Sequence, residues 1–144
     1  MGVADLLKAK KAAKAAENLA AGIAFLTENA KREGVISTEL GWQYEILKEG
    51  DGTKPSHKDK VKCHYHGTLI SGKVFDSSVN RGKPAVFALN KVIAGWTIAL
   101  QMMPVGSKWR IYLPPQLAYG EEQISADIGP NSTLIFEVEL LGIE

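Results

Sequence analysis

A change of sequence pattern near residue 34 is the feature that most constrains the fold of this chain. Residues 1–33 contain no proline and only two glycines, and they are rich in Ala, Lys and Glu, which are strong helix formers. From Gly41 onward, apolar residues recur at every second position, as in Val61, Cys63 and Tyr65. A period of two is typical of strands with one buried face. The pattern therefore predicts a long helix followed by an antiparallel sheet.

The first segment predicts one helix over residues 4–33, ended by Gly34. A helix of about 30 residues is about 45 Å long, which is more than a small domain can cover. Residues 8–14 are nearly all Ala and Lys and have little to bury. This half should therefore project, fray or pack on another chain. The second half carries an apolar stripe of Leu19, Ile23, Phe25 and Leu26.

The remainder of the chain predicts several strands and one short helix. Helical spacing of apolar residues occurs only in residues 92–102, and Pro104 and Gly106 follow them. A polar loop is expected over residues 77–83. The fold class is therefore α+β: an antiparallel half-shell wrapped on a short central helix, preceded by a long N-terminal helix. We expect two parts, residues 1–36 and 37–144. Strand patterns occupy residues 42–47, 61–66, 74–76, 85–89, 108–113 and 133–143.

Composition excludes several classes of function. A chain of 144 residues suits one domain with a proper core. Its net charge of +1 gives no reason to expect nucleic acid or an anionic membrane as a partner. No apolar run approaches the roughly 20 residues of a membrane span. Residues 1–11 lack the apolar region of a secretory signal, which favours the cytoplasm. The alternative is the periplasm or the cell surface, with the signal absent from this chain.

The usual catalytic motifs are missing, and we expect neither a metal nor a cofactor. His64 and His66 share a strand face and could hold a metal, but no third ligand has an informative spacing, so we interpret them as a solvated face. Cys63, the only cysteine, lies on the opposite face and is expected to be a small buried hydrophobe. Glu121 and Glu122 fall in a loop and should face solvent. Nothing in the chain indicates nucleophilic catalysis or hydride transfer.

Aromatic and β-branched residues from separate segments could instead converge on one concave surface. Each of them alone would be interpreted as a core residue, but together they match a known pattern. They are Tyr65, Phe75, Val92, Ile93, Trp96, Tyr119 and Phe136, with Asp76 beside them.

That pattern resembles the FKBP-type peptidyl-prolyl cis-trans isomerases, and the motifs keep order and spacing across residues 41–144. Upstream, GIAFLTENAKREG at 22–34 is similar to the linker helix of bacterial Mip-like members. The isomerase motifs are VKCHYHG at 61–67, GKVFDSS at 72–78, RGKP at 81–84, VIAGW at 92–96, LQMMPVG at 100–106, LAYG at 117–120 and PNSTLIFEVELL at 130–141.

The resemblance implies an enzyme that accelerates X-Pro isomerisation in protein folding, with chaperone-like client binding. Its partners would be proline-containing peptides, unfolded proteins and macrolide inhibitors of the rapamycin class. Trp96 would underlie the proline ring, and the Ile93 amide and the Tyr119 hydroxyl would donate hydrogen bonds. Asp76 would be held at the edge by Tyr65 and Arg81. The implied catalytic residues are Asp76, Tyr119, Trp96 and Phe136, and the implied binding residues are Tyr65, Phe75, Arg81, Phe87, Val92 and Ile93.

Three departures from the family pattern affect the rim of the pocket. Ala85 replaces an aromatic residue common in eukaryotic members, residues 121–127 differ from the Gly-rich bacterial loop, and Gly129 replaces a proline. Substrate preference and affinity are therefore expected to differ more than the activity itself. The alternative functions are a module that grips peptides with poor turnover, and a dimerisation role for the helix. We expect a monomer, or a weak dimer through the N-terminal helix.

Overall fold

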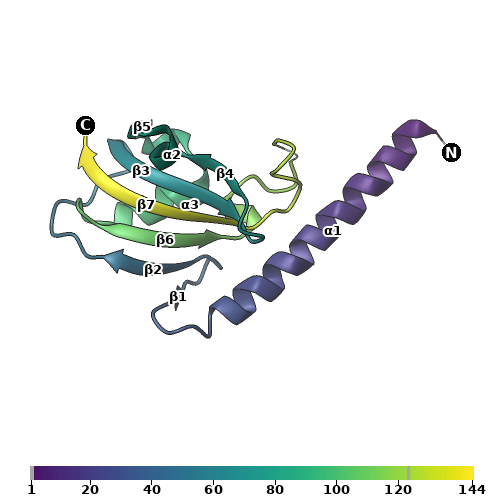
Figure 1. The fold of residues 1–144 in the computed structure, drawn as a ribbon, viewed down its shortest axis with the longest axis horizontal. Coiled ribbons are helices and arrows are strands. Elements are labelled where there is room, and N and C mark those ends of the chain that lie inside the picture. Colours follow the sequence, from purple (N-terminus) through teal and green to yellow (C-terminus); the bar gives the residue numbers. More distant parts are fainter. Residues whose placement is uncertain (1, 123) are drawn as a thin grey trace.

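A computed structural model describes residues 2–122 and 124–144 and contains a long helix beside a curved antiparallel sheet (Figure 1). The predicted fold class is confirmed. The helices are α1 (Val3–Asn29), α2 (Ser78–Arg81) and α3 (Ala94–Met102), with short 3-10 helices η1 (Leu89–Lys91) and η2 (Pro115–Leu117). The strands are β1 (Ile36–Ser37), β2 (Gln43–Lys48), β3 (Lys60–Leu69), β4 (Val74–Ser77), β5 (Ala85–Ala88), β6 (Lys108–Leu113) and β7 (Leu134–Ile143).

The sheet is built around its two longest strands. Its strand order is β1-β2-β6-β7-β3-β4, and β5 also pairs with β3. All pairs are antiparallel, and β3 faces β7 with Tyr65 opposite Val138 and Gly67 opposite Phe136. This register brings residues about 70 positions apart onto one face of the sheet, where the core and the candidate site lie.

The core forms between α3 and the concave face of the sheet. Val61 and Cys63 on β3 are fully buried, whereas Lys62 between them is exposed, as the period of two predicts. From α3, Trp96 and Leu100 lie four residues apart on the buried side. The alternation of the strands and the period of α3 thus meet in one core.

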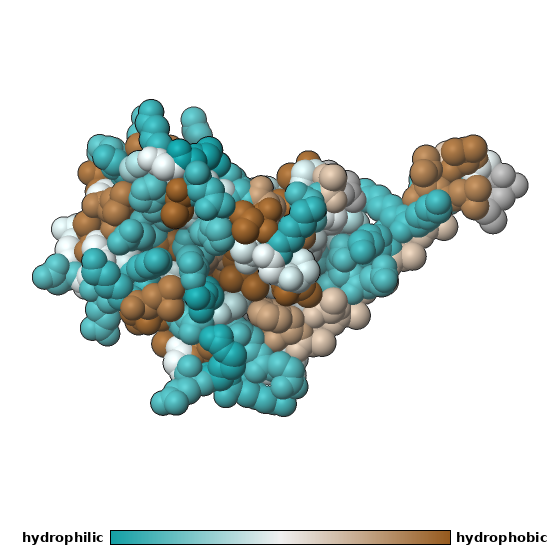
Figure 2. All heavy atoms as spheres, in the orientation of Figure 1, coloured by the Kyte–Doolittle hydropathy of each residue, from teal (hydrophilic) through white to brown (hydrophobic). Residues whose placement is uncertain are grey.

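Helix α1 contacts the sheet domain from about its middle, at Ala15, onward (Figure 1). Gly22 is buried there, and a Cβ atom added to it would lie 2.2 Å from Oγ1 of Thr133. The side chain of Asn18 donates a hydrogen bond of 2.8 Å to the carbonyl of Pro130. The first half projects beyond the domain as expected, and Figure 2 shows apolar side chains at its tip, where Val3 and Leu6 are exposed.

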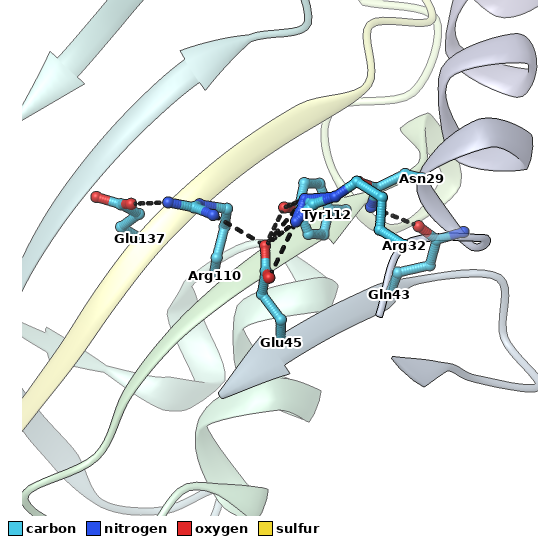
Figure 3. A network of polar contacts seen from close by, with 7 residues as sticks. All are labelled: Asn29, Arg32, Gln43, Glu45, Arg110, Tyr112 and Glu137. Carbon is cyan, nitrogen blue, oxygen red and sulfur yellow. Dashed lines mark hydrogen bonds and ion pairs between the residues drawn. The ribbon is translucent and has the colours of Figure 1, made fainter. Parts of the chain in front are cut away.

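The junction between α1 and the sheet is a polar network (Figure 3). Arg32, just beyond the helix, binds both carboxylate oxygens of Glu45 on β2, at 2.9 and 3.0 Å. Glu45 also accepts hydrogen bonds from Arg110, at 2.9 Å, and from Tyr112. Arg110 continues the network to Glu137 on β7. Three segments therefore meet at the Glu45 carboxylate, and Arg110 links a fourth, β7, to them.

The predicted end of α1 was wrong. The helix ends at Asn29 rather than residue 33, and the backbone continues in tighter turns, with the Lys31 amide donating to Glu28 and the Arg32 amide to Asn29. The Asn29 side chain donates to Gln43, at 2.8 Å. Gly34 has a positive φ, as a residue that ends a helix often has, but it lies beyond the turns that follow the helix. The apolar stripe is half covered, since Leu19 and Ile23 remain 40% and 58% exposed. Their side chains line one wall of a groove against the domain.

Smaller differences lie in the loops. The loop expected over residues 77–83 contains α2, which Ser77 caps by accepting a hydrogen bond from the Asn80 amide. Strand β1, of two residues, carried no readable pattern. In the departure loop, Glu121 and Glu122 are exposed, and Gln123 lies outside the described residues. Among the described helices, none has the length and hydropathy needed to cross a membrane.

Candidate functional site

A cavity of about 300 Å³ opens between α3 and the sheet. Nine of the ten site residues predicted from the sequence line it, so the segments do converge. The tenth, Arg81, lies outside the lining but contacts it through Asp76. Lys91 also lines the cavity and was not predicted. The lining residues are Tyr65, Phe75, Asp76, Phe87, Lys91, Val92, Ile93, Trp96, Tyr119 and Phe136.

Trp96 is at the centre of the aromatic wall. Its ring makes edge-to-face contacts with Tyr65, Phe87 and Phe136, at centroid distances of 5.4, 5.3 and 5.3 Å. Phe75 extends the wall by an edge contact with Phe136 at 5.5 Å. These separations are in the range that aromatic pairs prefer. The rings brace one another, so the cavity has a stiff and apolar inner surface.

Gly67 on β3 makes room for this wall. It pairs with Phe136 on β7, and a Cβ atom added to it would lie 2.6 Å from the Phe75 ring. Real Cβ atoms do not approach other atoms so closely, so any larger residue would displace Phe75. The glycine of the VKCHYHG motif therefore lets two rings meet across the sheet.

A polar trio occupies one edge of the cavity. The Tyr65 hydroxyl donates a hydrogen bond of 2.6 Å to Asp76 and accepts one of 2.8 Å from Arg81. Arg81 also forms an ion pair with Asp76 and lies over the Tyr65 ring, with its guanidinium carbon 5.6 Å from the centroid. The expected contacts of Asp76 with Tyr65 and Arg81 are confirmed.

The trio changes the acidity of its members. Partial burial alone would raise the pKa of Asp76, but hydrogen bonds from Tyr65 and Arg81 outweigh it and lower that pKa below its ordinary value. Burial and the hydrogen bond to Asp76 raise the pKa of Tyr65. Burial also raises the pKa of Tyr119, with a smaller contribution from the Asp76 charge. At neutral pH the site therefore holds a carboxylate and two phenols that keep their protons.

The two groups predicted to donate hydrogen bonds to the substrate, the Tyr119 hydroxyl and the Ile93 amide, lie at the rim of the cavity. Tyr119 follows η2 and is 36% exposed. Ile93 is the N-cap of α3, and its carbonyl accepts from the Trp96 amide at 3.0 Å. Within the described residues, no hydrogen bond uses the Ile93 amide, as is usual for the first N–H groups of a helix. A bound carbonyl oxygen could accept from this amide.

Two serines that the sequence analysis overlooked support β3, Ser78 at Tyr65 and Ser77 at His66. Ser78 Oγ accepts from the Tyr65 amide at 2.8 Å and lies 2.9 Å from Nδ1 of His64. Ser77 Oγ lies 2.8 Å from Nδ1 of His66. The two histidines are thus half-buried and bonded, which corrects the interpretation of a solvated face. The repeated serine in GKVFDSS was the available signal.

Other reactive groups do not assemble. Cys63 is fully buried, and burial raises its pKa to about 12, so it behaves as the expected small hydrophobe. Within the described part of the chain, no three His, Cys, Asp or Glu side chains gather as metal ligands would. The chemistry available in the cavity is therefore apolar contact and hydrogen bonding.

An α+β half-shell enclosing an aromatic cavity defines the class of this protein, and comparison with known proteins gives its family. A family model described as FKBP-type peptidyl-prolyl cis-trans isomerase matches residues 51–141. A second, described as a domain amino terminal to FKBP-type peptidyl-prolyl isomerase, matches residues 2–46. The chain belongs to the FKBP-type peptidyl-prolyl cis-trans isomerase family.

Relatives match both parts of the chain. The FKBP-type 22 kDa peptidyl-prolyl cis-trans isomerase of Escherichia coli is 56% identical over 124 residues, which cover 86% of this chain and 60% of that protein. Outer membrane protein MIP of Legionella longbeachae is 47% identical over 142 residues, covering 96% and 61%. The crystal structure of FkpA from Escherichia coli has a TM-score of 0.91 at 42% identity, covering 95% and 64%. The chain thus spans about three fifths of these relatives.

Proposed function

We propose that this protein accelerates the cis-trans isomerisation of X-Pro bonds, and that the aromatic cavity around Trp96 is where it does so. The observation that carries the proposal is the cavity itself: six aromatic residues and four aliphatic or charged residues surround a space of about 300 Å³, with Trp96 only 4% exposed. A prolyl ring with its flanking peptide is an apolar group of a size that such a cavity accepts.

The reaction suits a site without a nucleophile. Rotation about an X-Pro bond has a barrier of about 20 kcal/mol, because the amide loses resonance as it twists. No bond is made or broken. The twisted amide is less polar than the planar one, so an apolar wall of Trp96, Phe75 and Phe136 stabilises it relative to water. Only this difference between the two states accelerates the reaction.

Hydrogen bonds at the rim would add to that difference. The Ile93 amide is available at the N-terminus of α3, and Tyr119 keeps its proton at neutral pH. We assign both as donors to substrate carbonyl groups, and Asp76 as the residue that holds the edge in place through Tyr65 and Arg81. Each tenfold acceleration requires about 1.4 kcal/mol, so a few such interactions suffice.

The direct test is an isomerisation assay on a short proline peptide with purified protein. We expect turnover by the wild type and a loss of at least tenfold in kcat/KM for Trp96→Ala, since removing the ring opens the cavity to water. Circular dichroism establishes that the variant is folded. A folded wild type without turnover would overturn the proposal.

Macrolide inhibition and client binding are further parts of the proposal. An apolar cavity rimmed by hydrogen-bond donors would accept a rapamycin-class macrolide in place of a prolyl peptide, so the inhibitor should compete with the substrate. The exposed groove beside α1, with Leu19 and Ile23 on one wall, would add apolar surface for unfolded clients. Suppression of aggregation by protein with a macrolide-blocked cavity tests client binding separately from turnover.

A peptide-binding module with poor turnover is the second candidate function. The exposed groove beside α1 favours it, because this surface could grip a client without reaching Trp96. Isothermal titration with an unfolded client decides between the two when compared with the turnover assay. Tight binding with no acceleration of isomerisation would favour the module.

We propose residues 1–36 and 37–144 as the two parts of the chain, and a monomer or weak dimer as its state. The proposed boundary falls inside the two-residue strand β1 (Ile36–Ser37), where the chain passes from the helical segment into the sheet, and the projecting tip of α1 exposes a small apolar cluster. Sedimentation equilibrium at micromolar concentration tests the oligomeric state, and a tight dimer would contradict it.

The compartment of this protein stays a prediction with two alternatives. The first is the cytoplasm, and the second is the periplasm or the cell surface. Cell fractionation distinguishes them.

A further inference from the structure

Lys91 is a charged residue of the cavity wall that has no partner of its own. It ends η1 and directly precedes Val92 and Ile93, which line the same cavity. Its side chain is exposed, and among the described residues it takes part in no ion pair. Its ammonium group is therefore available to a charge that a ligand brings.

The charge balance of the cavity is positive. Asp76 and Lys91 are the charged residues among those that line it. The carboxylate of Asp76 is already neutralised, because Arg81 forms an ion pair with it and Tyr65 donates to it. The positive charge of Lys91 is not neutralised by any other described residue of the lining. An approaching peptide thus meets an apolar wall with one uncompensated cation at its edge.

We infer that Lys91 makes the cavity select proline-containing segments that carry an acidic side chain next to the proline, an inference that rests on the proposed isomerase function. A lysine ammonium is a point charge on a flexible four-carbon stem, so it can follow a carboxylate on either side of the proline ring. A lysine side chain of the segment would be repelled by the same charge. Lys91 is thus a specificity-determining residue.

The acidic loop near the rim does not cancel this charge. Glu121 and Glu122 come two and three residues after Tyr119, are exposed, and do not line the cavity. Exposed charges are screened by salt over about 10 Å at 0.1 M. Selectivity should therefore be set by the charge nearest the bound segment, which is that of Lys91.

The test is a comparison of kcat/KM for peptides that differ only in one residue next to proline. One set places Glu, Gln or Lys before the proline, and the other places the same residues after it. At an ionic strength of about 0.1 M we expect the wild type to favour Glu over Gln by about two- to fivefold in at least one set, the range expected of a partly exposed ion pair. The Lys peptide should fall below Gln, and added salt should reduce both differences.

Variants assign the preference to this position. Lys91→Gln should abolish it, and Lys91→Glu should invert it. Lys62→Glu is the matched control, because Lys62 is exposed on β3 outside the cavity and the change in net charge is the same. This control should keep the wild-type preference. Equal kcat/KM for the Glu and Gln peptides in both sets, or an equal effect of the control, would overturn the inference.

The outcomes separate this inference from the proposed function. Turnover of the Gln peptides without a preference for Glu refutes the role of Lys91 and leaves the isomerase intact. No turnover of any peptide refutes the isomerase. In that case the affinities of the same fluorescently labelled peptides, measured by anisotropy, still decide whether Lys91 selects acidic segments, since equal affinities for Glu and Gln peptides would overturn it.

Discussion

Single residues at the cavity edge act through Asp76, and the Tyr65 hydroxyl is the clearest example. Tyr65→Phe removes the 2.6 Å hydrogen bond to Asp76 and the acceptor for Arg81. We expect the pKa of Asp76 to rise toward its ordinary value, and kcat/KM to fall about fivefold, as the loss of one net hydrogen bond would give. Carbon-13 NMR titration of the carboxyl groups measures the first effect, and a peptide assay measures the second.

Tyr112→Phe is the control for this prediction. It removes a phenol that donates to Glu45 and is not part of the cavity lining. The control should leave the titration of Asp76 and the turnover unchanged. If Tyr65→Phe behaves like the control, the polar trio has no role in the site.

The buried thiol of Cys63 gives a second prediction at this scale. Burial raises its pKa to about 12, so the folded protein at pH 8 should resist alkylation by iodoacetamide. In urea the same thiol should react at the rate of a free cysteine. Mass spectrometry of the labelled protein measures both. Rapid labelling without denaturant would show that β3 opens far more readily than its central place in the sheet implies.

Side chains of the site were predictable to different degrees. The aromatic residues and Asp76 were found because they belong to motifs that resemble those of the FKBP family. Lys91 and Ser78 were not, because a lysine before an apolar run and a serine in a polar loop have many possible roles. Only the fold places Ser78, at the start of α2, against Tyr65, and Lys91, at the end of η1, in the cavity wall.

At the scale of elements, the contact of α1 with the sheet depends on the missing side chain at Gly22. At an exposed helix position, Gly→Ala stabilises by about 1 kcal/mol. Here the added Cβ would lie 2.2 Å from Oγ1 of Thr133, so we expect Gly22→Ala to destabilise the protein by about 1–3 kcal/mol instead. Urea unfolding measures the sign and the size.

A second substitution tests whether this contact is the cause. Thr133→Ala removes the clashing hydroxyl, which is buried and has no hydrogen-bond partner in the described structure. Adding it to Gly22→Ala should restore most of the lost stability, as expected for residues that touch. Additive losses in the double variant would place the cause elsewhere.

The carboxylate of Glu45 makes the junction of α1 and the sheet depend on pH. Burial alone would raise its pKa, but hydrogen bonds from Tyr112, Arg110 and Arg32 lower it below the ordinary value. A lowered pKa in the folded state adds stability above the ordinary value, near pH 4, and this stability is lost as the pH falls further. Wild type should therefore lose stability below about pH 4.

Glu45→Gln removes that dependence. The variant should be less stable than wild type by about 1–3 kcal/mol at pH 7, because Arg32 loses its carboxylate partner and Arg110 loses one of two, and wild type and variant should converge in acid. Urea titrations at several pH values measure this, with the exposed Glu39→Gln as the control. A constant difference across the pH range would contradict the role of Glu45.

Helix and strand boundaries show which elements could be read from the sequence. The periods of two and 3.6 located α1, α3 and six strands, since each of these elements has a buried face. The end of α1 was missed because Gly34 is the visible stop signal, whereas the backbone already leaves the helix in tight turns after Asn29. Strand β1 was missed because two residues carry no period.

At the scale of the whole molecule, the proposed function requires that catalysis and binding occur in the same cavity. The indole N–H of Trp96 can report on both, because it is buried in the cavity wall and has no hydrogen-bond partner among the described residues. Its NMR signal should shift when a prolyl peptide enters. The cis and trans signals of that peptide report the rate of exchange in the same tube.

The most direct measurement is therefore exchange NMR of a proline tetrapeptide with a sub-stoichiometric amount of this protein. We predict faster exchange in both directions, an unchanged cis to trans ratio, and a Trp96 indole shift that saturates with the peptide at stoichiometric protein. Trp96→Ala should lose the acceleration. A peptide that shifts the Trp96 signal without faster exchange would contradict catalysis, and faster exchange that survives in Trp96→Ala would contradict the site.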